Sequence, residues 1–330
     1  MRHPAPKTVG FFLSCAALLA VAAPAEARDQ IKIVGSSTVY PFATVVAERL
    51  GSSGKLKTPV IESTGTGGGM KLFCAGVGEG HPDITNASRK IKDSEVEMCR
   101  QNGVTDIVEI IVGNDGIVFA NSVKAPQQNL TKEQLWKAMA AKGPKPMMWS
   151  EIDPSLPKEK IVIFTPPPTS GTRDAWNELV MEKGCDPKVK EANEKDCALM
   201  REDGPVVEAG ENDALLVQKL EANPAAFAIF GFSYLDSNQD TIQASKIGGT
   251  EATLESIQRY DYAIARPLYF YVKKAHVGVI PGIKEYVEEF TSPAAMSDDG
   301  YLSDIGLVPL DDEKRQAVRS TAVELKTMTP

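Results

Sequence analysis

The stretch Phe164-Thr-Pro-Pro-Pro-Thr-Ser-Gly-Thr-Arg-Asp-Ala-Trp176 has the pattern of a strand end, a rigid bend and the first turn of a helix. Ile161 to Phe164 favour a strand, and the three prolines stop both strand and helix. Hydroxyl side chains and one glycine then precede the apolar positions of a helix. The free N–H groups at such a helix start, together with Arg173, can hold an anion. An ordinary N-cap at Ser170 would give the same pattern, so this stretch alone leaves both interpretations open.

A junction of the same kind occurs near the start of the chain. Ile31 to Val34 favour a strand, and Gly35-Ser-Ser-Thr-Val-Tyr-Pro41 leads from it into an amphipathic helix that we expect Gly51 to end. Hydroxyl groups and free N–H groups therefore coincide at this strand-to-helix junction as well.

A second strand begins at Val60 and Ile61, and Glu62-Ser-Thr-Gly-Thr-Gly-Gly-Gly69 connects it to a helix. This helix is expected to carry Met70, Phe73 and Val77 on its apolar face. Its glycines allow close approach of the backbone to a ligand, although a tight turn alone would also require them.

A third strand is predicted from Pro82 to Ala87, followed by Ser88-Arg89 and a helix from Asp93 to Gln101. Arg89 lies just past the carboxyl end of this strand, where open α/β sheets bind ligands. A solvated surface charge is the alternative interpretation of this residue.

Two long apolar runs predict passages between lobes. Ile107 to Ala120, interrupted by Gly113-Asn-Asp-Gly116, indicates a buried strand, a bend and a crossing into another lobe. Ile264 to Val272 is expected to cross back. Because strands and helices alternate elsewhere, the sequence predicts an α/β protein of two lobes, joined by a two-stranded hinge around a central ligand cleft that closes on its ligand.

The remaining segments complete this scheme. They predict helices over 130–141 (capped by Thr131), 214–222, 281–290 and 311–325, a strand over 227–232, a loop over 144–157 and a charged excursion over 185–203.

Residues 1–27 are predicted to be a cleaved secretory signal. Arg2 and Lys7 precede an apolar run, and Ala25-Glu-Ala27 offers a small-x-small cleavage site. Cys15 leaves lipidation as an alternative. Without this segment the chain has 34 Lys and Arg against 43 Asp and Glu residues, a net charge of −9. This balance argues against nucleic acid and anionic membranes as partners.

Four cysteines lie outside the predicted signal, an even number that indicates two disulfides in an exported chain. Of the three possible connectivities, we favour Cys74–Cys99 and Cys185–Cys197, because each closes a loop within one lobe. No two cysteines have C-x-x-C spacing, and His81 and His276 are the histidines that remain, so neither a metal site nor a cofactor is expected.

The three junctions, with Arg89 and Arg173, supply many hydrogen-bond donors and few acceptors. A tetrahedral oxyanion fits such a site, because its four oxygens accept many hydrogen bonds.

These residues resemble the phosphate-binding proteins of bacterial high-affinity phosphate ABC importers, which have the type II periplasmic binding protein fold. The likeness covers essentially the whole mature chain. The motifs that resemble the four binding loops of that family are, in order, Gly35-Ser-Ser-Thr-Val-Tyr-Pro41, Gly65-Thr-Gly-Gly-Gly69, Asp83 to Arg89 and Thr169-Ser-Gly-Thr-Arg173.

The resemblance implies a ligand set and a pair of lobes. Phosphate contacts are expected from Ser37, Thr38, Thr66, Ser88, Ser170, Gly171 and Thr172, and we add Gly67, Arg89 and Arg173 as candidates beside them. The lobes would comprise residues 29–114 plus 266–330, and residues 115–265. A monomer in the periplasm that delivers inorganic phosphate to the permease subunits of an ABC transporter is the implied function.

This sequence departs from the family pattern at two positions. Ser88 stands where the family has an aspartate that accepts the proton of hydrogen phosphate, and Pro166 stands where an arginine often precedes the fourth motif. Asp83, Asp115 and Glu62 are possible substitutes for the aspartate. Because a buried site rejects ligands that leave its groups unpaired, selectivity among phosphate, arsenate and sulfate is left open.

Other functions are compatible with an anion site. A secreted phosphatase is disfavoured, because the sequence has no H-E-x-x-H, G-x-S-x-G or P-loop pattern. A sensory or adhesive protein that binds the anion without delivering it is a further alternative.

Overall fold

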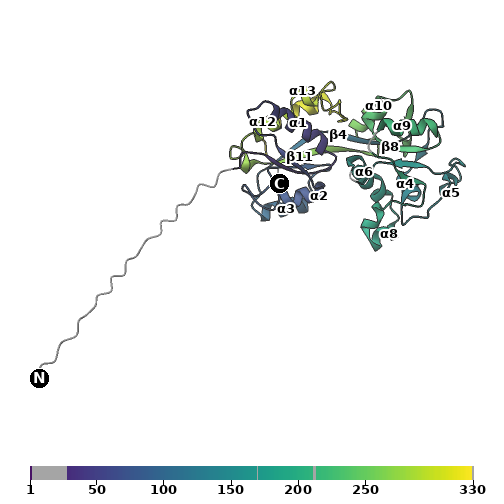
Figure 1. The fold of residues 1–330 in the computed structure, drawn as a ribbon, viewed down its shortest axis with the longest axis horizontal. Helices are drawn as coiled ribbons and strands as arrows, with labels where there is room; N and C mark the ends of the chain where they lie inside the picture. Colours follow the sequence, from purple (N-terminus) through teal and green to yellow (C-terminus); the bar gives the residue numbers. More distant parts are fainter. Residues whose placement is uncertain (2–27, 169, 211–212, 329–330) are drawn as a thin grey trace.

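We describe the chain from a computed structural model, which places residues 1, 28–168, 170–210 and 213–328. The predicted signal segment with Cys15, and Thr169 of the fourth motif, lie outside the described residues. The described part has a mixed α/β fold, in agreement with the predicted class (Figure 1). Within it, no helix combines the length and apolar character needed to cross a membrane.

Three parallel strands follow one another at the start of the chain. They are β1 (Lys32–Gly35), β2 (Val60–Ser63) and β3 (Ile84–Ala87), and the helices after them are α1 (Tyr40–Ser52), α2 (Thr66–Phe73) and α3 (Asp93–Gln101). Gly35 of β1 lies opposite Ser63 of β2 and Asn86 of β3. The chain therefore leaves all three strands at the same edge of the sheet.

Two long strands connect this part of the molecule to the rest (Figure 1). β4 (Ile107–Ser122) pairs antiparallel along its first part with β11 (Ala265–Lys273), which also pairs with β3. The second part of β4 pairs with β8 (Phe227–Gly231) and β9 (Ile242–Ala244). The predicted bend is a bulge within one continuous strand, because Leu268 lies opposite Gly113 while Tyr269 lies opposite Ile111.

The rest of the second part of the sheet is formed by β6 (Ile163–Thr165), which pairs in parallel with β7 (Val206–Glu208) and β8. A small second sheet pairs β5 (Asn129–Leu130) with β10 (Lys246–Ile247). The helices here are α4 (Lys132–Met139), α5 (Trp149–Ile152), α6 (Gly171–Trp176), a π-helix (Asn177–Met181), α7 (Glu182–Gly184), α8 (Pro187–Ala192), α9 (Asp213–Ala222), α10 (Phe232–Asp236) and α11 (Leu254–Gln258), with a 3-10 helix over Glu194–Ala198. The chain then returns to β11, a 3-10 helix (Lys274–His276), α12 (Ile283–Phe290), α13 (Pro293–Met296) and α14 (Asp312–Val323).

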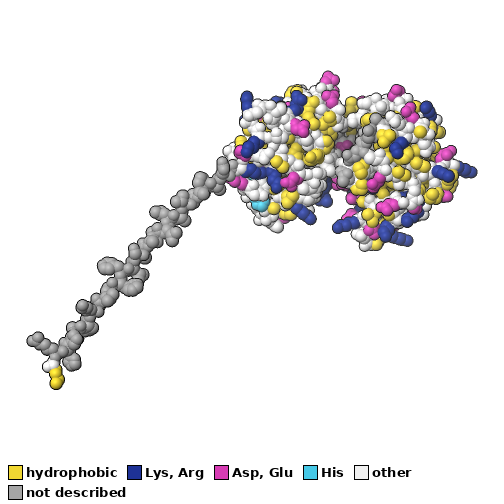
Figure 2. Space-filling view, viewed as in Figure 1, with side chains coloured by type: hydrophobic (Ala, Val, Ile, Leu, Met, Phe, Trp, Pro, Cys, Tyr) yellow, Lys and Arg dark blue, Asp and Glu magenta, His cyan; other side chains and the backbone are white. Residues whose placement is uncertain are grey.

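The elements form two groups, one on each side of the β4–β11 pair (Figure 1). The first group contains β1–β3, α1–α3 and α12–α14, and the second contains β6–β8 with α4–α11. Each group has its own hydrophobic core, around Phe270 and Phe290 in the first and around Phe119 and Trp176 in the second. Figure 2 shows the outline of the molecule indented between the two groups, with acidic and basic side chains interspersed over both.

Both predicted disulfides are present in the structure. Cys74–Cys99 joins the end of α2 to α3 within the first group, and Cys185–Cys197 joins the residues around α8 within the second. Thr131 caps α4 as predicted, since its Oγ1 accepts a hydrogen bond from the Gln134 N–H at 3.2 Å.

Several predicted boundaries were wrong by a turn or less. Gly51 lies inside α1, which ends at Ser52. Val77 is exposed beyond α2, because the chain turns at Gly76 and Gly78, both of which have positive φ. The predicted loop over 144–157 contains the short helix α5.

Candidate functional site

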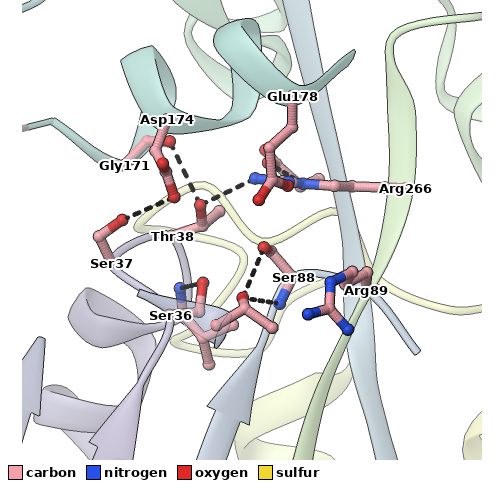
Figure 3. A network of polar contacts seen from close by, with 12 residues as sticks. Ser36, Ser37, Thr38, Ser88, Arg89, Gly171, Asp174, Glu178 and Arg266 are labelled. Atoms are coloured by element: carbon pink, nitrogen blue, oxygen red, sulfur yellow. Dashed lines mark hydrogen bonds and ion pairs between the residues drawn. The ribbon is translucent and has the colours of Figure 1, made fainter. Parts of the chain in front are cut away.

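The loops after β1, β2 and β3 meet at one edge of the sheet. The Ser36 N–H donates to the Asn86 carbonyl at 3.0 Å, which holds the loop after β1 against the end of β3. Thr66, the first residue of α2, and Ser88, just after β3, are both buried and lie 3.0 Å apart between their hydroxyl oxygens. The Ser88 N–H also donates to Thr66 Oγ1 at 3.1 Å. The structure thus brings three of the four predicted loops together (Figure 3).

Three helices at this place begin without a side-chain cap. They are α1, α2 and α6, and they follow Val39, Gly65 and Ser170. A side-chain oxygen caps the first turn of α4, α8, α11, α13 and α14, whereas α5, α10 and α12 also begin without a side-chain cap. The hydroxyl of Ser170 makes no capping hydrogen bond, so the ordinary N-cap interpretation of this residue does not hold. Such uncapped first turns present N–H groups and the positive end of the helix dipole to an anion.

The loop after β1 touches the start of α6, although more than a hundred residues separate them in sequence. Thr38 Oγ1 donates to the Gly171 carbonyl at 3.2 Å, and Ser37 Oγ donates to Asp174 Oδ2 at 3.1 Å (Figure 3). A Cβ on Gly171 would lie 2.9 Å from Thr38 Cα, which shows that this approach requires glycine. The fourth predicted motif therefore faces the first across the boundary between the two groups.

Arg266 is the cation at this boundary, and the sequence analysis did not identify it. It lies on β11, is 5% exposed, and its Nη2 donates to Thr38 Oγ1 at 2.9 Å. Its other nitrogens reach the carboxylates of Asp115, at 3.4 Å, and Glu178. Burial raises the pKa of the Asp115 carboxyl, while the charge of Arg266 acts in the opposite direction. The sequence signal for this residue is a single arginine near the start of the apolar run of β11. A buried charge at such a place needs polar or charged partners.

The two arginines that the sequence did suggest are both engaged elsewhere. Arg89 donates to both oxygens of Glu95, at 2.9 and 2.8 Å, and these hydrogen bonds raise its pKa. Arg173 is buried, and its Nη1 donates to Thr165 Oγ1 at 3.2 Å and to the Pro166 carbonyl at 3.0 Å. Burial lowers the pKa of this guanidinium, and its Nε has no hydrogen-bond partner among the described residues.

The other predicted residues lie on the first turns of these helices. Thr172 is half-buried at the second position of α6, and Gly67 is exposed at the second position of α2, with no atom within 4 Å of where a Cβ would be. Whether they or Arg89 contact a ligand stays a prediction. Among the described residues no cluster of His, Cys, Asp and Glu could hold a metal ion.

A family model described as a PBP superfamily domain matches residues 20–294, which is most of the chain. The chain belongs to the PBP superfamily. Among its PBP superfamily relatives, Protein SphX of Synechococcus elongatus is 30% identical over 93% of this chain and 86% of that protein. The phosphate-binding protein PstS of Staphylococcus saprophyticus is 28% identical over 80% of this chain and 76% of that protein.

A crystal structure described as a possible phosphate-binding protein from Planctomyces limnophilus matches 90% of this chain and 99% of its own, with a TM-score of 0.76 and 27% identity. Together with further phosphate-binding protein structures, it confirms the mixed α/β fold of type II periplasmic binding proteins and the resemblance drawn from the motifs.

The two departures from the family pattern have structural counterparts in this PBP superfamily chain. At Ser88 the hydroxyl pairs with Thr66, so no carboxylate stands at that position. At Pro166 the backbone carbonyl accepts a hydrogen bond from Arg173 Nη1 at 3.0 Å, so the guanidinium of the fourth motif lies beside this position.

Proposed function

We propose that this protein captures inorganic phosphate between two lobes and delivers it to an ABC importer. The lobes are residues 29–114 plus 266–330, and residues 115–265, and the pair β4 and β11 forms the hinge between them. In this proposal the two groups of elements correspond to the lobes, and the ligand binds where the loop after β1 faces α6.

The proposal depends mainly on one observation, which is that donors from distant segments converge at this boundary. Ser37, Thr38 and Arg266 are linked there by hydrogen bonds to one another or to α6. Thr66 and Ser88 lie at the same edge of the sheet. Hydroxyl groups, uncapped helix starts and a guanidinium are the groups that hold a dehydrated oxyanion.

The charge of Arg173 also supports an anionic ligand. Arg173 is 7% exposed and has no ion pair among the residues that the structure describes. A buried charge without a partner is costly, and an anion bound at the start of α6 would offset that cost.

The choice of phosphate rests on the names of the relatives, several of which are phosphate-binding proteins. By the same argument the protein is an extracytoplasmic binding protein rather than an enzyme. Its predicted signal segment would bring it to the periplasm, where a monomer would meet the permease subunits of its transporter.

Calorimetric titration of the purified chain with phosphate tests the proposal. We expect Thr38→Val to weaken phosphate binding at least about tenfold, because it removes a hydroxyl that meets both Arg266 and Gly171. Thr44→Val is the matched control, since the Thr44 hydroxyl donates to the Tyr40 carbonyl on α1. No heat of phosphate binding in the unmodified protein, or equal affinity in the two variants, would contradict the proposal.

A further inference from the structure

The segment 306–310, which lies between α13 and α14, connects the first group of elements to the second. The Asn114 N–H of β4 donates to the Val308 carbonyl at 2.7 Å, and the Val308 N–H donates to the Asn114 carbonyl at 3.1 Å. The ladder between β4 and β8 begins shortly afterwards, at Ile117. The segment is therefore bonded to β4 at the point where β4 passes from the first group into the second.

The side chains of this segment divide between the two hydrophobic cores. Leu307 and Leu310 belong to the core of the first group, whereas Val308 is 3% exposed and belongs to the core of the second. A Cβ on Gly113 of β4 would lie 2.7 Å from Leu307 Cδ1, so glycine allows the segment to approach β4 this closely. Because residues on both sides of Val308 are held by the first core, a rotation of one group against the other disturbs the packing of Val308 in the second.

Two side chains at the end of α11, in the second group, reach the same place. The Tyr260 hydroxyl donates to Asn114 Oδ1 at 2.6 Å, and Gln258 Nε2 donates to the Pro309 carbonyl at 3.0 Å. Asn114 is 1% exposed, so Tyr260 supplies a hydrogen-bond donor to a buried amide. Two hydrogen bonds and one apolar side chain thus link the groups beside β4.

The backbone of Tyr260 is unusual for a residue with a large side chain. Its φ is 60°, in the left-handed region, and its N–H donates to the Ile257 carbonyl at 3.1 Å. The Asp261 N–H donates to the Ser256 carbonyl at 2.9 Å, which completes a Schellman motif at the end of α11. Glycine is the usual residue at this position, because a Cβ is unfavourable there. The contact of its hydroxyl with Asn114 gives a physical reason for tyrosine at a helix end that favours glycine.

We propose that the segment 306–310 and Tyr260 form a latch that keeps part of the ligand-free protein in a closed arrangement, in which the loop after β1 touches α6. The inference rests on the proposed function, because it requires the two groups to open and close about β4 and β11. The latch contacts and the contact between Thr38 and Gly171 are present in the same structure. Opening breaks or strains the latch contacts, so they favour the closed population.

The latch lies outside the loops that form the candidate site, so it acts on the conformational equilibrium and not on the ligand. A ligand held between the groups binds more tightly when closure is more favourable. The factor is the same for every oxyanion that the closed arrangement holds, because the latch does not contact the ligand. A latch therefore changes affinity without changing selectivity, which a residue of the site would change.

Distances between two spin labels measure the open and closed populations directly. We place the labels at Ser94→Cys on α3 and Ala192→Cys on α8, two exposed positions in the first and second groups (Figure 1). The four cysteines outside residues 1–27 are all in disulfides, so the labels attach to the introduced thiols. For the ligand-free protein we expect two distances, and we expect added phosphate to leave the one that corresponds to closure.

Tyr260→Phe keeps the ring and removes the hydroxyl, so it should lower the ratio of closed to open ligand-free protein at least about threefold. Tyr301→Phe is the matched control, since the Tyr301 hydroxyl donates to Glu289 within the first group. Calorimetry should show that Tyr260→Phe weakens phosphate and arsenate binding by the same factor, again at least about threefold. Gln258→Met, which removes the other hydrogen bond, should change the populations in the same direction.

A purely structural role for Tyr260 would lower the unfolding temperature of Tyr260→Phe and leave its populations as they are. The same distance distribution in Tyr260→Phe and Tyr301→Phe therefore overturns the latch and leaves the proposed function intact, as does a ligand-free unmodified protein that is entirely open. Failure of the unmodified protein to bind phosphate overturns the proposed function, and the populations of the ligand-free variants then still decide whether the latch exists.

Discussion

At the scale of single residues, Arg266 shows how a buried cation is kept in an apolar strand. Its three nitrogens reach Thr38, Asp115 and Glu178, which come from three different parts of the chain. Removal of this guanidinium leaves the largely buried Asp115 carboxylate uncompensated, which is usually worse for a protein than the loss of the pair itself. Arg266 therefore both joins the segments that meet at the boundary and supplies a positive charge there.

We expect Arg266→Gln to weaken phosphate binding by about 2 to 3 kcal/mol, because it removes a charge-assisted donor from a water-poor site. Arg89→Gln should cost less than about 1 kcal/mol, since Arg89 is already paired with Glu95 and is partly exposed. Titration calorimetry measures the phosphate affinity of both variants, and thermal unfolding checks that they are folded. A larger loss of phosphate affinity in Arg89→Gln than in Arg266→Gln would mean that Arg89, and not Arg266, is the main cationic contact of the ligand.

At the scale of secondary-structure elements, the junctions between strands and helices were predicted well from the sequence. Prolines, glycines and hydroxyl residues determine locally where a strand ends and a helix starts, as at Gly35 to Pro41 and Pro166 to Ser170. The groups that meet across the boundary were predicted less well. Arg266 lies within the mostly apolar strand β11. Glu178 lies in a π-helix, and no local sequence pattern predicts a π-helix there.

Lys273 illustrates another contact between elements that the sequence did not indicate. It lies on β11 with 1% of its surface exposed, and its Nζ donates to the Gly76 carbonyl at 2.5 Å, just after α2. The ring of Phe73 lies 4.9 Å from the same ammonium group. Burial lowers the pKa of Lys273 to about 8. The ammonium group that joins β11 to the chain just after α2 therefore loses its proton at mildly alkaline pH.

This lowered pKa predicts how stability depends on pH. Between about pH 8 and about 10.5 the unfolded chain keeps the Lys273 proton while the folded chain releases it, so folding becomes more favourable as the pH rises. Relative to Lys273→Met, the unmodified protein should gain about 2 kcal/mol of unfolding free energy between about pH 7.5 and about pH 9.5. Denaturant unfolding at both pH values measures this difference, with the exposed Lys274→Met as control. A difference that stays constant or falls with pH would show that the Lys273 charge is not buried in solution.

At the scale of the whole molecule, the proposed function requires the two groups of elements to approach each other around the ligand. Gly171 is where such an approach is tightest, because a Cβ there would lie 2.9 Å from Ser37 O and 2.9 Å from Thr38 Cα. Both are backbone atoms, which cannot give way as a side chain can. Within α6 itself alanine is compatible with the helix and is favoured over glycine by up to about 1 kcal/mol.

Gly171→Ala should therefore leave the protein folded but keep the two groups apart. We expect small-angle scattering to show compaction of the unmodified protein when phosphate is added, and little or none for Gly171→Ala, together with at least about tenfold weaker phosphate binding. Gly80→Ala is the control, since no atom lies within 4 Å of a Cβ at that position. Compaction and affinity in Gly171→Ala equal to those of the control would mean that the ligand does not bring the loop after β1 against α6, and the binding residues would then have to act without closure of the hinge.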